Sequence, residues 1–374
     1  MKIVTVIGAR PQFIKAASVS RAIQKFNKRK KCVQEILIHT GQHYDYKMNQ
    51  VFFKELELPK TKYHLEVGSN SHARQTGLIL ERIETILEKE KPNVVLVYGD
   101  TNSTLGGALA SAKLSIPVAH VEAGLRSYNR KMPEEINRVL TDHLSTFLFC
   151  PTNQAVENLK KEGIKDGKER VVKNVGDVMY DSILYYSKVA EEKSTILKDL
   201  GFDTKHETRV TDYYLATLHR AENTDDPKRL KSILKALNEI GKVVPVVLPL
   251  HPRTRKMMNV YQLSVMHDRV RIIEPVSYLD MLELEKNAKL ILTDSGGVQK
   301  EAYWFEVPCL TLRDETEWME TVRSGWNLLV GSEADRIIEG INQVSRREHQ
   351  GKTQNEFGRG NASEKIIDNL LKFR

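Results

Sequence analysis

Short β-branched, apolar runs alternate with longer amphipathic segments almost from end to end of the chain. This alternation constrains the fold most, because parallel strands need helical crossovers to connect them. In the first half it predicts buried strands at residues 3–7, 36–39, 94–98, 118–121 and 147–150. Helices are expected between them at 75–90, 105–114 and 134–144. The pattern therefore predicts a doubly wound α/β domain with a parallel sheet.

A second alternating series follows a break near residues 174–177 and a charged, helical segment at 178–211. Its strands are expected at residues 213–217, 244–248, 271–273, 290–293 and 309–312. A length of 374 residues also favours two domains. We therefore expect domains at 1–175 and 176–360 that face each other across a cleft. A C-terminal helix at 361–374 is expected to pack back on the first domain.

Charge and composition exclude several functional classes. The formal net charge is +8, but its short basic stretches have no interleaved aromatic residues for stacking bases, so no nucleic-acid partner is expected. No signal peptide is recognisable, and no apolar run approaches the ~18 residues of a membrane helix. The three cysteines, Cys32, Cys150 and Cys309, suggest neither a disulfide framework nor a metal site. A cytoplasmic protein without a metal or a membrane partner is expected.

A glycine-rich turn, Asp294-Ser295-Gly296-Gly297, follows an expected strand of the second domain. Glycines let the backbone approach a ligand, and the helix that follows offers unpaired N–H groups to a phosphate. Glu301, one turn further on, could accept hydrogen bonds from a ribose. An ordinary strand–helix turn accounts for these residues equally well. The turn is neither GxGxxG nor GKS/GKT, which disfavours hydride transfer and ATP hydrolysis.

Cationic and imidazole side chains follow other strand ends. Arg10 and Lys15 lie near the start of the helix after the first strand, where they can meet negative charge. An exposed arginine at a helix start, without a ligand, is also common. His219 could serve as an acid, a base or a charge stabiliser, although a lone histidine is more often structural. His251 follows another strand and joins the candidate ligand-binding residues.

Three carboxylates lie where the edge of an open parallel sheet carries its ligands. Asp100 and Glu122 each follow an apolar strand, and Glu134 begins a helix. Asp100 and Glu134 could simply be helix-capping acids, whereas a buried Glu122 would need a partner. Crowded carboxylates raise one another's pKa, so one can act as an acid and another as a base near neutral pH.

Eight segments taken in order match a known pattern: GARPQFIK, GQH at 41–43, YGDTNST, HVEAGLRS, MPEEINR, TLHRAEN, ILTDSGGVQKEA and LRDETE. Together they resemble the non-hydrolysing UDP-N-acetylglucosamine 2-epimerases over essentially the whole chain. The resemblance implies a GT-B-like fold of two Rossmann-type domains, a homodimer without a cofactor, and UDP held mainly by the second domain. It also implies UDP-binding and catalytic residues, namely Ser295, Gly296, Gly297 and Glu301 with Arg10 and Lys15 for UDP, and Asp100, Glu122, Glu134 and His219 for catalysis.

The reaction that the resemblance implies is anti elimination of UDP to a 2-acetamidoglucal, followed by syn re-addition from the other face. A base must remove the C2 proton, an acid must return one, and cations must stabilise the departing diphosphate. Arg10 and His219 suit the charge stabilisation, and the three carboxylates would share proton transfer and orientation. Which carboxylate is the acid stays open. The implied pathway is the synthesis of surface-glycan precursors.

Two departures from the family pattern concern the substrate. Gln12 stands where better-known members have glutamate, and Trp318-Met319 stands where they have Arg-Pro. Both resemble the branch that epimerises UDP-2,3-diacetamido-2,3-dideoxyglucuronate, whose carboxylate should prefer fewer acidic neighbours. That sugar is the alternative substrate. Gln42 and His43 match part of an allosteric UDP-sugar site found in some relatives.

Three other functions share parts of the pattern. A GT-B glycosyltransferase would share the fold but would not need three carboxylates converging on C2. A hydrolysing epimerase would share nearly every residue and release free N-acetylmannosamine and UDP. A sugar-nucleotide sensor would bind without turnover.

Overall fold

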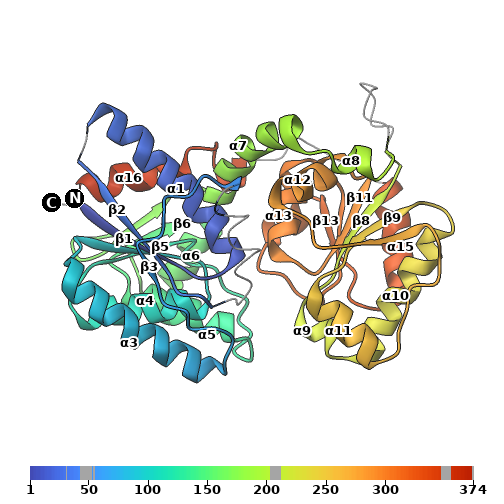
Figure 1. Ribbon diagram of the computed structural model, residues 1–374, viewed down its shortest axis with the longest axis horizontal. Coiled ribbons are helices and arrows are strands. Elements are labelled where there is room, and N and C mark those ends of the chain that lie inside the picture. Colours follow the sequence, from blue (N-terminus) through green and yellow to red (C-terminus); the bar gives the residue numbers. More distant parts are fainter. Residues whose placement is uncertain (31, 43–52, 54, 203–211, 347–354, 373–374) are drawn as a thin grey trace. The chain divides into compact units, whose positions relative to one another are not determined.

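The computed structural model describes residues 1–30, 32–42, 53, 55–202, 212–346 and 355–372. The chain forms two compact units, Met1–Leu184 with Asn355–Arg374, and Tyr185–Gln354 (Figure 1). The division falls inside helix α7, Val178–Lys193, slightly beyond the boundary expected at residue 175.

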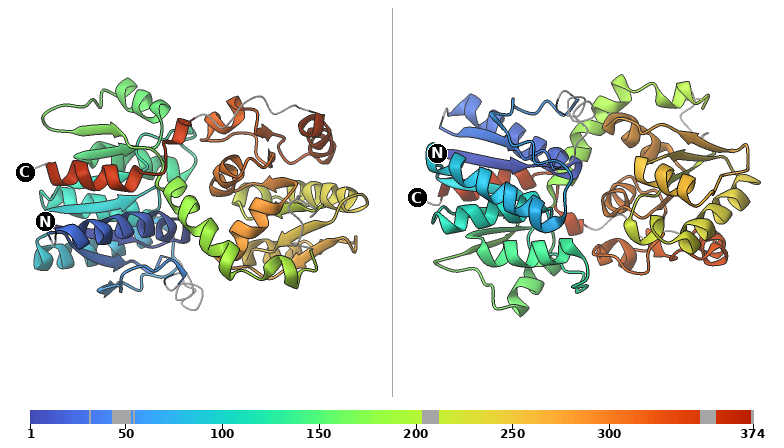
Figure 2. Two further views of the ribbon diagram at one scale, coloured as in Figure 1. Left: turned by 90° about the horizontal axis from the view of Figure 1, so that it is seen from above. Right: turned by 60° about the horizontal axis from the view of Figure 1, so that its bottom comes forward.

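The first unit is built on a parallel sheet in the order β3-β2-β1-β4-β5-β6-β7. Its strands are β1 (Lys2–Ile7), β2 (Gln34–His39), β3 (Tyr63–His64), β4 (Val94–Tyr98), β5 (Val118–Val121), β6 (Phe147–Cys150) and β7 (Val171–Asn174). Its other elements are α1 (Arg10–Arg29), α3 (His72–Glu90), α4 (Asn102–Lys113), α5 (Pro133–Leu144), α6 (Asn153–Lys161), the 3-10 helix Asn355–Phe357 and α16 (Ala362–Lys372). Helices α3, α4 and α5 cover one face of the sheet, and α1 and α16 lie side by side on the other (Figures 1 and 2). An ion pair of 2.6 Å joins Lys25 of α1 to Glu364 of α16.

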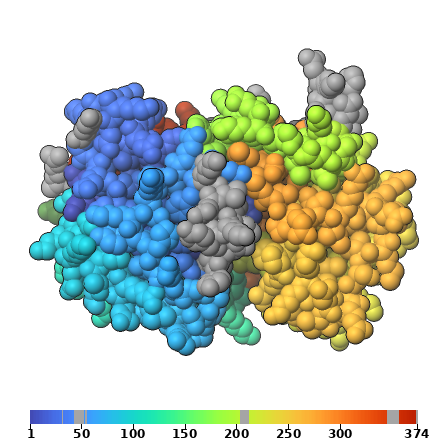
Figure 3. Space-filling model, in the orientation of Figure 1, coloured from blue at the N-terminus to red at the C-terminus, as the bar shows by residue number. Residues whose placement is uncertain are grey.

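Helix α3 shows how the sequence pattern places a helix on the sheet. Ile79, Ile83 and Leu87 recur at helical spacing and are buried against residues of β1 and β4. Glu81, between Ile79 and Ile83, and Glu88, directly after Leu87, are exposed. The helix therefore contributes to the outer surface of the first unit (Figure 3). None of the helices in the described residues has the length and apolarity that a membrane crossing requires.

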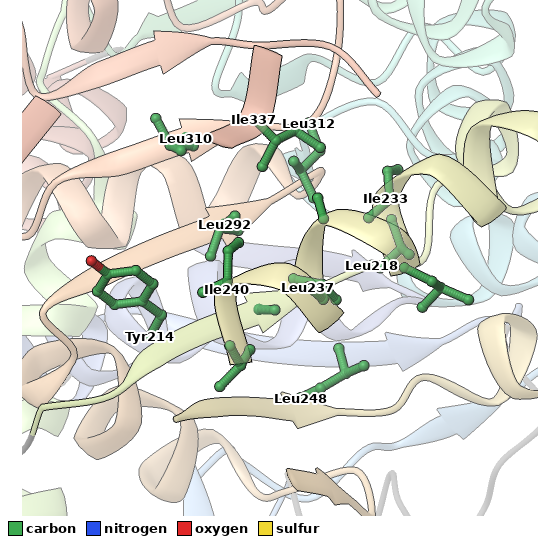
Figure 4. Packing of buried hydrophobic residues seen from close by; sticks show 14 of the residues in the cluster. Tyr214, Leu218, Ile233, Leu237, Ile240, Leu248, Leu292, Leu310, Leu312 and Ile337 are labelled. Atoms are coloured by element: carbon green, nitrogen blue, oxygen red, sulfur yellow. The ribbon is translucent and has the colours of Figure 1, made fainter. Parts of the chain in front are cut away.

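The second unit has a parallel sheet in the order β10-β9-β8-β11-β12-β13. Its strands are β8 (Tyr214–Thr217), β9 (Val246–Pro249), β10 (Val270–Ile273), β11 (Leu290–Thr293), β12 (Cys309–Thr311) and β13 (Asn327–Leu329). Its helices are α8 (Ile196–Asp199), α9 (Ala221–Thr224), α10 (Pro227–Gly241), α11 (Pro252–Val260), α12 (Tyr278–Asn287), α13 (Gly296–Trp304), α14 (Met319–Arg323) and α15 (Ala334–Arg346). Leu237 and Ile240 of α10 and Ile337 of α15 pack on Leu292 and Leu310 of the sheet (Figure 4).

In each sheet, the strands that follow the first strand in the chain are added first on one side of it and then on the other. In the first unit β1 lies between β2 and β4, and in the second β8 lies between β9 and β11. Successive crossovers leave such a switch point in opposite directions, which opens a crevice at the carboxyl ends of the two strands. The turns after β1 and β4, and those after β8 and β11, are therefore the expected places for ligands. The prediction of doubly wound α/β units is confirmed.

Candidate active site

The turn after β1 is closed by Gln12 of α1. The side-chain Oε1 of Gln12 accepts hydrogen bonds from the backbone N–H groups of Gly8 (2.8 Å) and Ala9 (3.1 Å). Its Nε2 donates to the carbonyl of Tyr98 and to Oγ1 of Thr104, both at 3.0 Å. Gln12 is 1% exposed, and these four bonds use its hydrogen-bonding capacity. It therefore shapes the turn and does not present its amide to a ligand.

The same turn requires glycine and places Arg10. A Cβ on Gly8 would overlap the hydroxyl oxygens of Thr40 and Ser103, so the backbone passes closer to these side chains than any other residue allows. Arg10 is the first residue of α1 and is half-buried. Its side chain thus starts at the carboxyl edge of the sheet.

Glu122 follows β5 and is held in an unusual backbone conformation. Its φ is +74°, the left-handed region, which costs a non-glycine residue roughly 1–2 kcal/mol. Its carboxylate forms a buried ion pair with Nζ of Lys15, and the two residues are 8% and 7% exposed. Strain of this kind persists where the surroundings fix it, and it is often found at functional sites. Lys15 therefore meets a carboxylate in the first unit, in addition to any ligand it contacts.

Asp100 follows β4 and lies among the other charged candidates. Its Oδ2 is 2.6 Å from Nη2 of Arg138, and the Asp100 side chain is 34% exposed. Burial among protein atoms raises the pKa of the Asp100 carboxyl group; Arg138 and Lys15 lower it, and Glu122 and Glu134 raise it. The structure thus brings three predicted carboxylates, Lys15 and the unpredicted Arg138 within electrostatic range of one another.

The capping alternative for Asp100 is not supported. Thr101 is the N-cap of α4, and its Oγ1 accepts the N–H of Thr104. Glu134 lies in the first turn of α5, where an acid also suits the helix dipole. Its neighbour Glu135 is the buried acid of this pair and accepts hydrogen bonds from the N–H groups of Ser127 (2.9 Å) and Tyr128 (3.0 Å).

Replacing Gly99 by alanine is expected to lower kcat by about 10²-fold, since small displacements of catalytic groups have effects of this size. A Cβ at Gly99 would lie 3.2 Å from both Oε2 of Glu122 and Nζ of Lys15. Gly163→Ala is the matched control, because Gly163 also has positive φ and nothing lies within 4 Å of its Cβ position. Both variants should melt at lower temperature. Equal kcat values for the two would contradict the placement of the Glu122–Lys15 pair in the active site.

In the second unit, the turn after β11 leads into the N-terminus of α13. Ser295 is the N-cap; its Oγ accepts from the N–H of Val298 (3.5 Å), and its N–H donates to Thr293 Oγ1 (2.9 Å). A Cβ on Gly296 would lie 2.6 Å from Oε1 of Glu317 and 3.1 Å from Nε1 of Trp318. Gly297 is half-buried in the first turn of the helix, and Glu301 is buried one turn later. The turn is thus narrow and can bind an anion at its backbone N–H groups.

Asp294, immediately before this turn, holds the turn after β8. Its fully buried carboxylate accepts hydrogen bonds from the N–H groups of His219 (3.1 Å) and Arg220 (2.9 Å) and from Nδ2 of Asn223 (3.2 Å). Nδ1 of His219 is 3.3 Å from Oδ1 of Asp294, and the His219 ring is 5.3 Å from that of His251, centroid to centroid. His251 is the exposed N-cap of α11. The structure therefore brings the two predicted histidines together beside the predicted phosphate turn.

Arg313 and Glu317 are functional candidates that the sequence reasoning did not single out. Arg313 is 1% exposed, and its guanidinium binds Oε1 of Glu222 (3.0 Å) and Oε2 of Glu317 (3.1 Å). Nζ of Lys300 lies 3.8 Å from the centroid of the Trp318 ring, a cation–π contact. Glu317 and Trp318 border Gly296. In the sequence, the run of charged residues that follows β12 was the feature that could have identified Arg313 and Glu317.

Gly296→Ala is expected to weaken UDP binding by about tenfold to 10²-fold, because overpacking costs roughly 1–3 kcal/mol. The new methyl group must displace Glu317 or Trp318 from the start of α13. Titration calorimetry with UDP checks this, with Gly77→Ala as the control, since nothing lies within 4 Å of a Cβ at Gly77. Unchanged affinity in Gly296→Ala would remove the N-terminus of α13 from the nucleotide site.

Two earlier expectations lie at the edge of what the structure describes. Gln42 accepts hydrogen bonds from the backbone N–H (3.1 Å) and Oγ (2.7 Å) of Ser103, whereas His43 lies outside the described residues. Within residues 1–372, leaving out the undescribed gaps, no group of three or more His, Cys, Asp or Glu side chains is arranged to hold a metal ion.

Comparison with known proteins gives a consistent result along the whole chain. The family model for UDP-N-acetylglucosamine 2-epimerase matches residues 25–371. A Methanococcus maripaludis protein named UDP-N-acetylglucosamine 2-epimerase homolog is 54% identical over 99% of both chains. A Pseudomonas aeruginosa UDP-2,3-diacetamido-2,3-dideoxy-D-glucuronate 2-epimerase is 51% identical over 100% of both.

Among solved structures, the UDP-GlcNAc 2-epimerase of Methanocaldococcus jannaschii, in complex with UDP-GlcNAc and UDP, is 45% identical to this chain. It matches with a TM-score of 0.90 over 100% of both chains. The expected GT-B-like fold of two parallel-sheet α/β units is confirmed.

Proposed function

The chain belongs to the UDP-N-acetylglucosamine 2-epimerase family, and on that premise we propose that it inverts C2 of a UDP-linked 2-acetamido sugar. Membership makes the chain an isomerase. The observation that carries the proposal is the group formed by Asp100, Glu122, Glu134, Lys15 and Arg138 at the carboxyl edge of the first sheet. Inversion at C2 needs both a base and an acid, and carboxylates in unequal surroundings supply the two.

We assign proton transfer and substrate orientation to Asp100, Glu122 and Glu134. Glu122 is buried and ion-paired with Lys15, whereas Asp100 is paired with Arg138 and burial raises its pKa, so the two carboxylates have unequal surroundings. The C2 proton leaves as the bond from C1 to the UDP oxygen breaks, which gives the 2-acetamidoglucal and UDP. UDP then returns to C1 and a proton to the other face of C2. The product is an isomer of the substrate.

We assign UDP binding mainly to the second unit. Ser295, Gly296 and Gly297 offer the start of α13 to the diphosphate, and Glu301 suits the ribose hydroxyls. We also assign UDP binding to His251, Arg10 and Lys15. His219 and Arg10 together stabilise the negative charge that develops on the departing diphosphate. No cofactor is required, because the proton transfers involve carboxylates alone.

Two sugars compete as the natural substrate. UDP-N-acetylglucosamine is the first, and the Methanocaldococcus jannaschii relative was solved with it. UDP-2,3-diacetamido-2,3-dideoxyglucuronate is the second, favoured by the 51% identical Pseudomonas aeruginosa relative and by Trp318 beside the predicted phosphate turn. The corresponding product of the first would be UDP-N-acetylmannosamine, a precursor for surface polysaccharide.

The test is incubation of the purified chain with each sugar nucleotide and identification of the products by proton NMR. The proposal expects a UDP-linked epimer from at least one of them. Free UDP with free N-acetylmannosamine would instead show the hydrolysing reaction. No product from either sugar would overturn the proposal in favour of a UDP-sugar sensor or a GT-B glycosyltransferase.

Assembly and location are part of the proposal. We expect a cytoplasmic homodimer, as the family resemblance implies. The exposed apolar residues Ile136 and Leu140 share one face of α5 in the first unit, which supports a subunit contact there. Sedimentation velocity of the chain and of Ile136→Glu tests this: a monomeric wild type would contradict the homodimer.

A further inference from the structure

A buried histidine that the proposed mechanism does not use links two of its turns. His120 lies in β5 and is fully buried. Its Nδ1 is 2.7 Å from Oδ1 of Asp142 in α5, and its Nε2 is 2.7 Å from the carbonyl oxygen of Gly99 at the end of β4. Both ring nitrogens therefore face oxygen atoms at hydrogen-bond distance.

The identity of these partners fixes the protons on the ring. A backbone carbonyl cannot donate, so Nε2 must carry the hydrogen of the bond to Gly99. The other carboxylate oxygen of Asp142 accepts from Nη1 of Arg126 (2.7 Å) and from the N–H of Gly124 (3.1 Å). These donors, one of them a guanidinium, favour the ionised form of the Asp142 carboxyl group independently of His120. Asp142 is thus an anion, and Nδ1 must carry a hydrogen as well.

A buried imidazolium is compatible with its surroundings because the charges balance. Arg126 also binds both carboxylate oxygens of Glu162 at 2.7 Å. Two cations, His120 and Arg126, therefore face two anions, Asp142 and Glu162. His120, Arg126 and Asp142 are buried, whereas Glu162 is half-buried. Removal of one of the buried members leaves an uncompensated charge.

The network is attached to the backbone next to two of the proposed catalytic carboxylates. The carbonyl of Gly99 immediately precedes Asp100, and the N–H of Gly124 lies two residues after Glu122. Helix α5 supplies Asp142 to this network and, one turn earlier, Arg138 to the Asp100 side chain. The turns after β4 and β5 are thereby tied to each other and to one helix.

We propose that His120 is a positioning residue, a buried imidazolium that sets the separation of the Asp100 and Glu122 turns for proton transfer at C2. The effect on catalysis rests on the proposed function, whereas the hydrogen bonds of His120 do not depend on it. A residue that served folding alone would alter the fraction of folded protein and leave the kcat of the folded enzyme unchanged. A positioning residue alters kcat while the affinity for UDP, assigned to the second unit, is kept.

The test compares His120→Gln with the double variant His120→Gln/Asp142→Asn. In the single variant the glutamine amide can donate to Gly99, but its oxygen then faces the Asp142 carboxylate. In the double variant the asparagine that replaces Asp142 can donate to that oxygen, while its own oxygen still accepts from Gly124 and Arg126. The chain of hydrogen bonds is then restored without the charges of His120 and Asp142.

We expect kcat to fall by about 10²-fold in His120→Gln and to recover by about tenfold in the double variant, a coupling within the range seen for residues in contact. KM and the calorimetric affinity for UDP should stay near wild type in both. Wild-type kcat in folded His120→Gln, or a double variant no faster than His120→Gln, would overturn the positioning role.

A second measurement does not depend on activity or on the folding of a variant. In the wild-type chain labelled with 15N-histidine, NMR should show directly bonded protons on both Nδ1 and Nε2 of His120, assigned by correlations from the ring to the His120 backbone in the wild-type spectrum. A single N–H on this ring would overturn the imidazolium. If the wild type does not epimerise either sugar nucleotide, the proposed function fails, while this NMR result still decides the state of His120.

Discussion

Glu122→Gln is expected to lower kcat by about 10²–10⁴-fold, the range that a general acid or base contributes, while the affinity for UDP is unchanged. The glutamine keeps the shape of the side chain and can still accept a hydrogen bond from Lys15, but it cannot exchange a proton. The strained φ of +74° and the buried ion pair with Lys15 hold this carboxylate in a fixed position. Steady-state kinetics and UDP calorimetry on the same preparation separate catalysis from binding.

The matched control is Glu88→Gln, which changes an exposed glutamate on α3 of the same unit. It should keep the wild-type kcat. Circular dichroism checks that Glu122→Gln is folded, because Lys15 loses its anionic partner in this variant. A folded Glu122→Gln enzyme that turns over like wild type would remove Glu122 from the chemistry.

In Arg138→Met, we expect the limb of the kcat/KM pH profile that reports the ionisation of Asp100 to move to higher pH. At neutral pH, kcat/KM should fall by about tenfold to 10²-fold. Burial already raises the pKa of Asp100, and Arg138 opposes that rise. Without the guanidinium the pKa rises further, so a smaller fraction of Asp100 is ionised at a given pH. If Asp100 is the base, the acidic limb of the profile moves up; if it is the acid, the alkaline limb does.

The same change has a defined sign for stability. A carboxyl group whose pKa is raised in the folded state stabilises the fold fully below its unfolded value, near 3.8, and loses that contribution as the pH rises through the folded value. Arg138→Met should widen this window, so urea unfolding should show a steeper loss of stability with rising pH than wild type. Arg74→Met, at an exposed position of α3, serves as the control. pH profiles that coincide with wild type would contradict the Asp100–Arg138 pair.

The central strands and the edge strand β10 could be predicted from the sequence, whereas the other edge strands could not. Strands β4, β5, β6 and β11 begin and end at the predicted residues, because strands covered on both faces consist of continuous apolar runs. Strands β3, β7 and β13 were missed. Each lies at the edge of its sheet, and short sequences such as Tyr63–His64 and Asn327–Leu329 carry too little apolar pattern to be recognised.

The active-site candidates could be predicted because the sequence shows where the strands end. The residues that pair with them could not, because they lie on other elements and come close only in the folded chain. Arg138 lies on α5 and reaches Asp100 only in the folded unit. Glu134 and Glu135 cannot be told apart from the sequence. Only the structure shows that Glu135 is buried and accepts hydrogen bonds from the N–H groups of Ser127 and Tyr128. The left-handed conformation of Glu122 likewise has no sequence signal, because glycine is the residue expected there.

The measurement that tests the account most directly is a proton NMR time course in deuterated water with UDP-N-acetylglucosamine, and with the diacetamido glucuronate if the first sugar does not react. Proton transfer at C2 by the carboxylates of the first unit predicts a UDP-linked epimer that carries deuterium at C2. An epimer that retains its original C2 proton, or no epimer from either sugar, would contradict the account.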